Sequence, residues 1–165
     1  MDQAAFLNFG PSMAQLPTGA FLTTEGRFNP MTIGWCQLGI VWGKPVCTVF
    51  VRKSRFTYGL MEQSPSFCVS VPKQGELTDA LALCGSRSGR DMDKAKEAAL
   101  SPIQIVAGAA PGVAGCETYY VCRKLFWADS DLDRLDPALR ARYYGPTQAG
   151  ADGDPHVIYF GELLP

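Results

Sequence analysis

A short basic loop in the middle of the chain has the residue types that hold a phosphate. The stretch CGSRSGRDMDK, residues 84–94, brings together hydroxyl groups, guanidinium groups and an ammonium group. Serine hydroxyls and basic side chains are donors that bind the doubly charged phosphate of a nucleotide or a phosphorylated cofactor. The same residues are also compatible with a solvated turn, in which Asp91 and Asp93 balance the three basic side chains. Both interpretations stay open on this stretch alone.

A second basic turn, RKSRFT at residues 52–57, follows an apolar run and precedes a helical pattern. It would place Arg52, Ser54 and Thr57 at the start of a helix, where unpaired backbone N–H groups favour an anion. The alternative is that Ser54 or Thr57 caps the helix while the arginines are solvated. Two such turns in one small chain favour a shared phosphate, because each supplies donors that the other lacks.

Residues 29–32, Asn-Pro-Met-Thr, offer a different kind of contact. The residue before a proline is held extended, so backbone amides and carbonyls here can face outward in a fixed array. Such an array suits the edge of a flat heterocycle. Trp35 and Trp42 flank it with apolar surface, and both are equally compatible with a place in the core.

The usual signatures of nucleotide binding and covalent catalysis are missing. The sequence has no GxGxxG, and the nearest approach to a Walker loop, residues 39–44, is one residue short and runs into Pro45. His156 is the one histidine, which leaves little from which to build a serine or cysteine triad or a zinc site. We therefore expect no metal, and we expect any demanding chemistry to fall to a bound cofactor.

The composition limits the size and the partners of the protein. The 165 residues are 47% apolar, enough for one domain over residues 1–165 with a substantial core. The net charge is −1 and the basic residues are not gathered into a run, so neither a nucleic-acid surface nor a membrane patch is indicated. The six cysteines contain no CxxC, and no leader or membrane span is visible. We expect reduced core cysteines in a cytoplasmic protein.

Short β-branched and aromatic runs outnumber the helical patterns, and the two do not alternate regularly. This arrangement favours a mainly β fold, an antiparallel barrel with short helices at its ends, over a parallel sheet. Asp136 followed by Pro137 is typical of a helix start, and residues 107–115 and 145–155 are expected to be loops. Strands are expected at residues 18–24, 31–42, 45–52, 66–72, 103–106, 116–127 and 156–164, and helices at residues 55–63, 76–83, 91–98 and 136–143.

Three ordered stretches make the sequence similar to a known family. They are NPMTIGWCQLGIVWGKPVCTVFVRKSRFTYGLME, ALCGSRSGRDMDK and GDPHVIYFGEL, within residues 17–98 and 153–163. With them the chain resembles the flavin reductase-like family, which includes the flavoredoxins. The resemblance implies an antiparallel FMN-binding split barrel that forms a homodimer and holds FMN near the dimer interface. Pro155 stands where the family usually has an aromatic residue, and residues 99–150 match only in general character.

The resemblance also assigns residues of this chain to the parts of FMN. The flavin ring would be lined by Asn29, Pro30, Met31, Thr32, Thr48, Val49, Phe50 and Val51. The phosphate would be held by Arg52, Ser54, Thr57, Ser86, Ser88, Gly89, Arg90 and Lys94. His156 matches the histidine of the family's closing motif, which lies near the nicotinamide or the flavin, and it is the candidate catalytic residue.

The activity implied by the resemblance is that of an NAD(P)H-dependent flavin oxidoreductase. NADH or NADPH would pass hydride to FMN, and the electrons would leave on the flavin or to a redox partner protein. Two alternatives remain, a flavoredoxin-type electron carrier that takes electrons from a protein donor, and a noncatalytic module that binds another anion or a partner. The choice between NADH and NADPH stays open, because no further basic residue can be assigned to a 2′-phosphate.

Overall fold

Strands dominate the computed structural model, which describes residues 9–146 and 153–165 of the chain. The elements in chain order are α2 (Phe9–Gln15), β1 (Ala20–Thr24), β2 (Met31–Ile33), β3 (Cys36–Val41), β4 (Lys44–Arg52), α3 (Phe56–Gln63), β5 (Ser66–Val71), α4 (Thr78–Ser86), α5 (Lys94–Glu97), β6 (Pro102–Ile103), β7 (Gly112–Val113), β8 (Thr118–Asp129), the 3₁₀ turn η1 (Leu132–Arg134), α6 (Pro137–Tyr144) and β9 (His156–Leu163). None of the helices in this part of the chain is long and apolar enough to span a bilayer.

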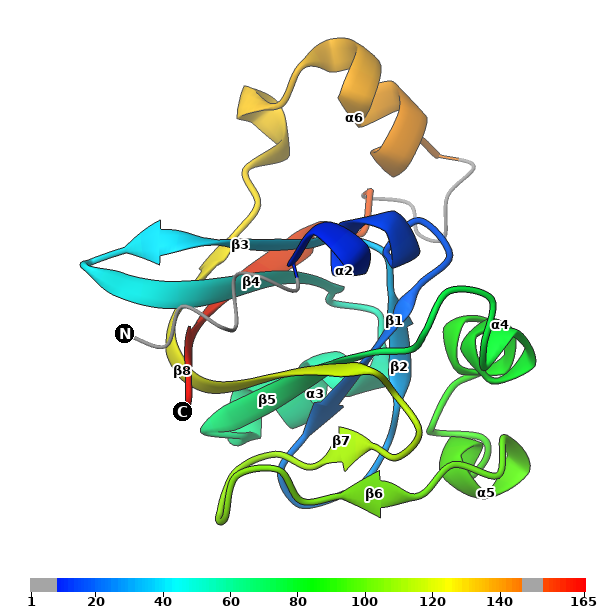
Figure 1. Ribbon diagram of the computed structural model, residues 1–165. Coiled ribbons are helices and arrows are strands. Elements are labelled where there is room, and N and C mark those ends of the chain that lie inside the picture. Colours follow the sequence, from blue (N-terminus) through cyan, green and yellow to red (C-terminus); the bar gives the residue numbers. More distant parts are fainter. Residues whose placement is uncertain (1–8, 147–152) are drawn as a thin grey trace.

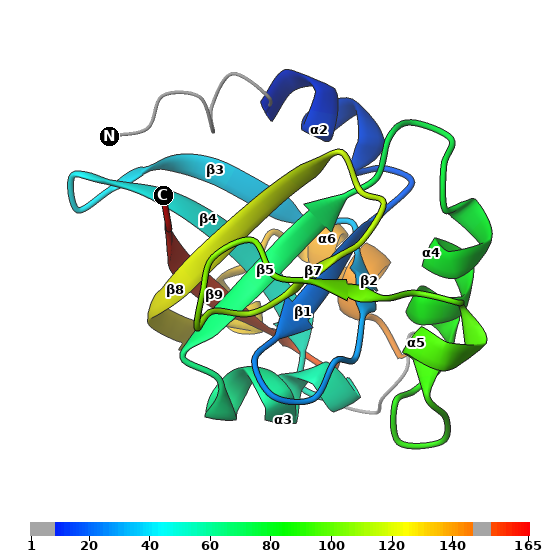
Figure 2. The ribbon, with the colours of Figure 1, turned by 60° about the horizontal axis from the view of Figure 1, so that its bottom comes forward.

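Seven of the strands form one antiparallel sheet in the order β2-β1-β5-β8-β9-β4-β3, which curls around the main core (Figure 1). The remaining two, β6 and β7, pair with each other. This confirms the mainly β split-barrel fold expected from the sequence. Figure 2 shows α4 and α5 together on one side of the barrel and α3 below it, while α6 stands beyond β3 and β4 in Figure 1.

The split of the barrel lies between two strands that are neighbours in sequence. β2 and β3 stand at opposite edges of the sheet, and only Gly34 and Trp35 connect them. An edge strand has N–H and C=O groups without a strand partner, so β2 presents backbone donors and acceptors to the opening. The sequence predicted one strand over residues 31–42. That prediction is wrong, because the chain crosses the split at these two residues.

Burial along the strands follows their place in the sheet. β1 and β5 are buried at every position because both of their faces are covered. Leu22 and Val69 belong to the main core inside the barrel, whereas Phe21 packs in a second cluster with residues of α4 and Cys68 in a third cluster with Ala109 and Ala110. The side chains of a strand alternate between its faces, so a strand covered on both faces is buried at every position.

Other boundaries differ from the expectations in ways that have simple causes. The strand expected at residues 103–106 is reduced to Pro102–Ile103, which pairs with β7 inside the segment expected to be a loop. The helix expected at residues 91–98 is confined to α5, because the Asp93 side chain caps it by accepting from the backbone N–H of Lys96. Asp136 caps α6 as expected. Residues 147–152 of the expected loop at 145–155 lie outside the described residues.

Candidate functional site

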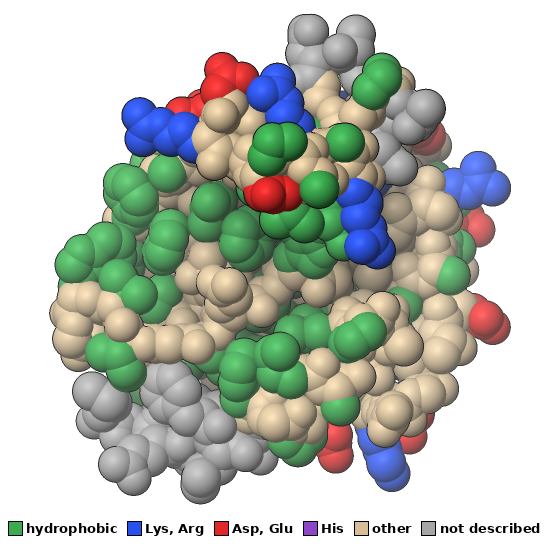
Figure 3. Space-filling view, turned by 90° about the horizontal axis from the view of Figure 1, so that it is seen from above, with side chains coloured by type: hydrophobic (Ala, Val, Ile, Leu, Met, Phe, Trp, Pro, Cys, Tyr) green, Lys and Arg blue, Asp and Glu red, His purple; other side chains and the backbone are tan. Residues whose placement is uncertain are grey.

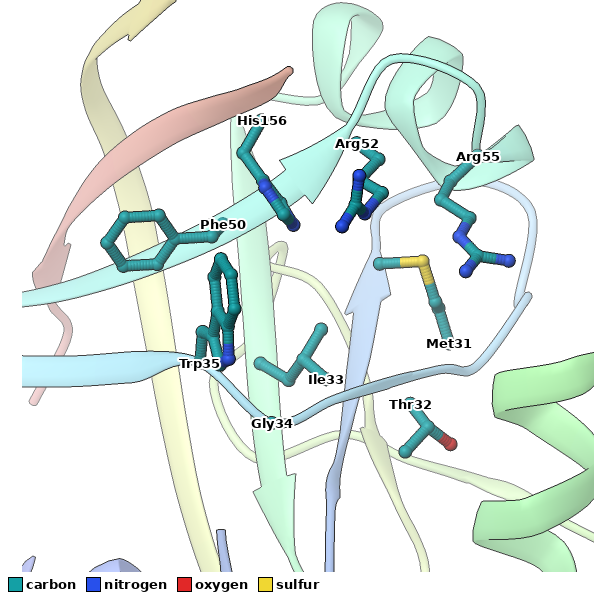
Figure 4. Close-up of a pocket in the computed structure, with 9 residues that line it drawn as sticks. All are labelled: Met31, Thr32, Ile33, Gly34, Trp35, Phe50, Arg52, Arg55 and His156. Carbon is teal, nitrogen blue, oxygen red and sulfur yellow. The ribbon is translucent and has the colours of Figure 1, made fainter. Parts of the chain in front are cut away.

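The split of the barrel opens into a cavity of about 220 Å³, here called the aromatic cavity. Its wall comes from the β2–β3 connection on one side and from the ends of β4 and β9 on the other (Figure 4). The residues that line it are Met31, Thr32, Ile33, Gly34, Trp35, Phe50, Arg52, Arg55 and His156. Trp35 remains 38% exposed, so this tryptophan belongs to the cavity and not to the core.

Aromatic rings hold His156 in place at this cavity. The indole of Trp35 lies over the imidazole with ring centroids 4.7 Å apart and an interplanar angle of 36°. The hydroxyl of Tyr144, at the end of α6, lies 2.6 Å from His156 Nδ1. Figure 4 shows the imidazole directed toward the cavity between Arg52 and Trp35. His156 is therefore fixed by contacts from the β2–β3 connection and from α6.

The environment of His156 keeps its imidazole neutral at pH 7. Burial, followed by the positive charge of Arg52, lowers the pKa of His156 to about 4. Burial also raises the pKa of Tyr144, so its hydroxyl stays protonated and shares a hydrogen bond with Nδ1 of the imidazole. A neutral ring carries one N–H, and the direction of this hydrogen bond sets which nitrogen holds it. This arrangement provides a neutral imidazole, not an acid.

Arg52 is already bonded within the protein. Its guanidinium donates to the backbone carbonyls of Tyr143 and Asp154, at 2.8 and 3.0 Å, and lies over the Tyr144 ring. It lines the aromatic cavity but not the neighbouring cavity that contains the other basic side chains. The structure thus separates Arg52 from the residues with which it was expected to hold a phosphate, because β4 pairs Arg52 with His156 at the ring side.

A second cavity of about 120 Å³, here called the basic cavity, adjoins the first. The two share Met31, Thr32 and Arg55, so they form the two ends of one site. The α3 start and the loop between α4 and α5 supply most of its wall. The residues that line it are Met31, Thr32, Ser54, Arg55, Phe56, Thr57, Cys84, Gly85, Arg87, Ser88, Gly89, Arg90 and Lys94.

Lys94 is the notable side chain of the basic cavity. It is only 3% exposed, and its ammonium donates to the carbonyl of Cys84 at 3.2 Å. Burial lowers the pKa of Lys94, and the neighbouring charge of Arg55 acts in the same direction. Among the described residues, no carboxylate forms an ion pair with Lys94. A buried charge without a counter-charge is costly, so this cavity is suited to an anion.

Two glycines allow the walls of the basic cavity to come together. A Cβ on Gly89 would lie 2.0 Å from Asn29 Oδ1 and 2.8 Å from Phe56 Cδ1, so this loop residue can only be glycine. A Cβ on Gly85 would lie 3.3 Å from the Cβ of Thr32, where α4 packs on β2. Thr32 Oγ1 also donates to the carbonyl of Leu81 at 2.6 Å. These contacts hold the loop and β2 side by side.

The expected hydroxyl donors take different places. Ser54 lines the cavity and donates to Asp154 through its hydroxyl and its backbone N–H. Thr57 accepts from the amide of Asn29, and Ser88 accepts from the backbone N–H of Arg90. Neither Ser54 nor Thr57 caps α3, whose N-cap is Arg55 without a side-chain bond. The capping alternative is therefore wrong.

Some expected residues do not reach either cavity. Ser86 turns back to its own helix and donates to the carbonyl of Ala82 at 2.8 Å. Val49 and Val51 lie in the main core because alternate residues of β4 face inward, which leaves Phe50 at the cavity. The buried residues Asn29, Pro30 and Thr48 also line neither cavity. The Asn29 side chain instead packs behind the wall of the basic cavity, where its amide donates to Thr57 Oγ1 and its Oδ1 lies close to Gly89.

Several residues that the fold brings to the site were not predicted from the sequence. Arg55 lines both cavities and Arg87 lines the basic one, although neither was assigned a contact. The sequence did contain a signal for both, because Arg55 stands in the basic turn at residues 52–57 and Arg87 in the basic loop at residues 84–94. Tyr143 and Tyr144 come from the region with the weakest pattern, and no local signal placed them against Arg52 and His156.

The comparisons with known proteins agree with this geometry. The family described as "Flavin reductase like domain" matches residues 13–130, more than half of the chain. No curated protein matches the sequence. Solved structures with TM-scores of 0.62 to 0.66 share the fold.

Three of these structures illustrate the range of proteins that share the fold. An FMN-binding protein from Thermus thermophilus, with bound p-hydroxybenzaldehyde, is 21% identical at a TM-score of 0.65, over 89% of this chain and 69% of that one. Flavoredoxin from Methanosarcina acetivorans is 21% identical at 0.66, over 89% and 66%. The NADH:FAD oxidoreductase of Streptomyces globisporus is 18% identical at 0.65, over 89% and 72%.

Proposed function

The chain belongs to the flavin reductase like domain family, and on this premise we propose that it binds FMN and transfers hydride from NADH or NADPH to the flavin. The observation that carries the proposal is Lys94, a buried ammonium without a carboxylate partner among the described residues, at one end of the split. Trp35 and His156 stand at the other end. An apolar ring with a phosphate tail is the ligand class that matches both ends.

The residues of the site fit FMN at its phosphate. Lys94 would form the charged floor of the basic cavity, and Arg90 and Ser88 would complete the contacts at its rim. The guanidinium of Arg90 lies over the Phe56 ring and donates to the Ser54 carbonyl, which limits its freedom before any ligand arrives. A donor that is already oriented loses less entropy on binding.

The residues of the aromatic cavity would orient the ring. When bound, FMN supplies a ring that accepts hydride from a reduced nicotinamide and then gives up the electrons. The unpaired edge of β2 would bond the polar edge of the ring, and Trp35 would exclude water from its face. His156 would present a neutral imidazole to the ring, and hydride transfer needs no acid from it.

The test is an absorbance spectrum of the purified protein with FMN, followed by anaerobic addition of NADH and then NADPH. Bound flavin that bleaches within seconds supports the reductase and shows its preferred nicotinamide. Bound flavin that stays yellow with both nicotinamides, but is reduced rapidly by a protein donor, would identify an electron carrier, as in the flavoredoxins that share the fold. A protein that binds no flavin would overturn the proposal.

The protein's exposed apolar face favours a homodimer. Ile40, Trp42, Phe126 and Trp127 are 55%, 60%, 46% and 48% exposed, and the ring centroids of Trp42 and Phe126 lie 6.0 Å apart. Figure 3 shows apolar side chains spread over the face that includes the β3–β4 hairpin, with most charged side chains near its edges. Trp42 also has a φ of 54°, which is strained for a bulky residue. A second copy of the chain that covers this face would remove these apolar side chains from water.

The dimer can be tested with a matched pair of substitutions. Ile40→Asp should weaken self-association by about tenfold or more, because it places a charge in the apolar face. Ile103→Asp makes the same change at an exposed position of β6 and should leave association unchanged. Sedimentation velocity measures both. A wild-type monomer at all concentrations would refute this proposal.

The cysteines favour a reducing, cytoplasmic setting. All six lie in the described residues and none forms a disulfide, although the sulfurs of Cys36 and Cys47 are 3.5 Å apart. Five of them are buried, as expected for small core residues. The presence of unpaired thiols at this distance is typical of proteins from a reducing compartment.

A further inference from the structure

A third cavity, of about 420 Å³, lies between α6 and the barrel and is here called the α6 cavity. Within the described residues, neither η1 nor α6 contributes a buried side chain, although both elements line this cavity. The helix stands away from the sheet, as Figure 1 shows. Apolar side chains cover both walls of the space between them, with Trp35, Phe50 and Ile158 on the barrel and Leu132, Leu135 and Leu139 on the opposite side.

The last turn of α6 holds the helix at this height above the barrel. The carbonyl of Tyr143 accepts from the Arg52 guanidinium at 2.8 Å, and the Tyr144 hydroxyl lies 2.6 Å from His156 Nδ1. The ring of Tyr143 also meets the indole of Trp35, with centroids 5.3 Å apart. These contacts fix the helix at one end while the cavity stays open beneath it. The α6 cavity is thus formed before any ligand arrives, as is usual for small-molecule sites.

The charged groups at the polar end of the α6 cavity are already paired. In the described chain, these are Asp129, Asp131 and Arg134. Asp129 forms an ion pair with Lys53 at 2.9 Å, and Asp131 forms one with Arg134 at 3.1 Å. Asp131 also accepts from the backbone N–H of Asp133 at 3.0 Å. A charged ligand would lose its hydration without gaining a free partner, so the cavity is suited to a neutral molecule.

The walls and the volume of the α6 cavity favour an aromatic ligand. The Trp35 indole stands edge-to-face against Phe50 and Tyr143, with interplanar angles of 81° and 85°. Rings in this arrangement offer both faces and edges to a further planar ring. An apolar cavity of about 150 Å³ holds one benzene, so a molecule with two rings fits the larger space here.

We propose that the α6 cavity binds a neutral aromatic small molecule of one or two rings, separate from the flavin. The cavity shares Trp35 and Phe50 with the aromatic cavity, so its ligand would lie beside the flavin ring. Leu139 lines the α6 cavity and neither of the other two, which makes it the position at which to test the inference. The inference goes beyond the proposed function, because this ligand needs none of the donors that would hold the phosphate.

The experiment titrates the full-length protein, without flavin, with the neutral fluorescent probe N-phenyl-1-naphthylamine, whose emission rises when it leaves water. Leu139→Arg should raise the dissociation constant of the probe about tenfold, because it places a charge at the rim of an apolar cavity. Ile105→Arg makes the same change outside the cavity, at a position that is 43% exposed against 45% for Leu139. This control should leave the dissociation constant unchanged.

Competition with the bound probe tests the chemical class of the ligand. 2-Naphthol should displace the probe at about fivefold lower concentration than its saturated counterpart decahydro-2-naphthol, because contacts between rings add roughly that factor. The charged analogue 2-naphthoate should be about tenfold weaker than 2-naphthol, since the cavity offers its carboxylate no free partner.

Four results would overturn the inference. The wild type could fail to bind the probe, or Leu139→Arg could leave its affinity unchanged, which would place the probe in the aromatic cavity or on the β3–β4 face. 2-Naphthol could displace the probe no better than its two analogues. Leu139→Arg could weaken self-association in sedimentation velocity, which would assign the cavity to a second copy of the chain. A protein that binds the probe as expected but binds no flavin would overturn the proposed function alone, so the two failures are distinguishable.

Discussion

The two ends of the split differ in how far their polar side chains are already bonded to one another. At the aromatic end, Arg52 donates to two carbonyls and His156 is bonded to Tyr144. At the basic end, Lys94 is buried against one carbonyl and has no carboxylate partner among the described residues. Bonded groups stabilise the folded chain, whereas an unbalanced buried charge is stabilised only when an anion arrives. Removal of a bonded polar group at the aromatic end should therefore destabilise the protein without ligand, whereas removal of the Lys94 charge at the basic end should stabilise it.

The largest effect is expected where packing alone shapes the basic end. Gly89→Ala should lower the free energy of unfolding by about 3 kcal/mol, because the new Cβ overlaps the amide of Asn29 and the ring of Phe56. Urea denaturation measures it. Gly59→Ala in α3 is the matched control, since nothing lies within 4 Å of its Cβ position, and it should be neutral or stabilising. Equal losses in the two variants would contradict the close packing of the loop.

Lys94→Met tests the unbalanced charge itself. We expect the dissociation constant for FMN to rise about 30-fold, equivalent to about 2 kcal/mol, while that for riboflavin changes little. In the absence of ligand, the free energy of unfolding should rise by about 1 kcal/mol, because a buried cation is replaced by an apolar side chain of similar length. Flavin titration and urea denaturation measure the two quantities. A variant that loses FMN and riboflavin equally would remove Lys94 from the phosphate site.

The neutral histidine at the aromatic end makes stability depend on pH. The pKa of His156 is about 4 in the folded protein, below the usual 6.5, so the unfolded chain binds a proton between these values and the folded one does not. The free energy of unfolding should fall by about 1.8 kcal/mol from this group as the pH drops from 7 to 5.

His156→Gln provides the control for this prediction, because the chain contains no other histidine. Urea denaturation of both proteins at pH 7 and pH 5 isolates the contribution of the imidazole. The wild type should lose more stability than the variant over this interval. Identical losses would mean that the imidazole is not held neutral by its surroundings.

The smallest effect concerns the single hydroxyl that joins α6 to the aromatic end. Tyr144→Phe should lower the free energy of unfolding by about 1 kcal/mol, the usual value of one hydrogen bond. Tyr143→Phe is the control, since the Tyr143 hydroxyl makes no hydrogen bond to the described residues. Thermal denaturation compares the two. A larger loss in the control would show that α6 is held by Tyr143.

The sequence predicted the basic loop better than the strand beside it. Ser88, Gly89, Arg90 and Lys94, which were assigned to one loop, all line the basic cavity, whereas Ser86 of the same loop does not. Their approach depends on a short segment with its own turn and helix start, which local sequence describes well. The prediction that all four of residues 48–51 line the flavin ring was less accurate, because only Phe50 lines the aromatic cavity. Alternation along a strand allows at most every second residue to face one side.

By itself the sequence determined the residue types of the site and the mainly β fold, because turns, caps and apolar runs act over a few neighbouring positions. Only the tertiary structure decided that β2 and β3 lie at opposite edges of the sheet, which creates the split. It also decided that Lys94 is buried and that Tyr144 meets His156. These contacts depend on which distant strands and helices pack together, and no local pattern specifies that choice.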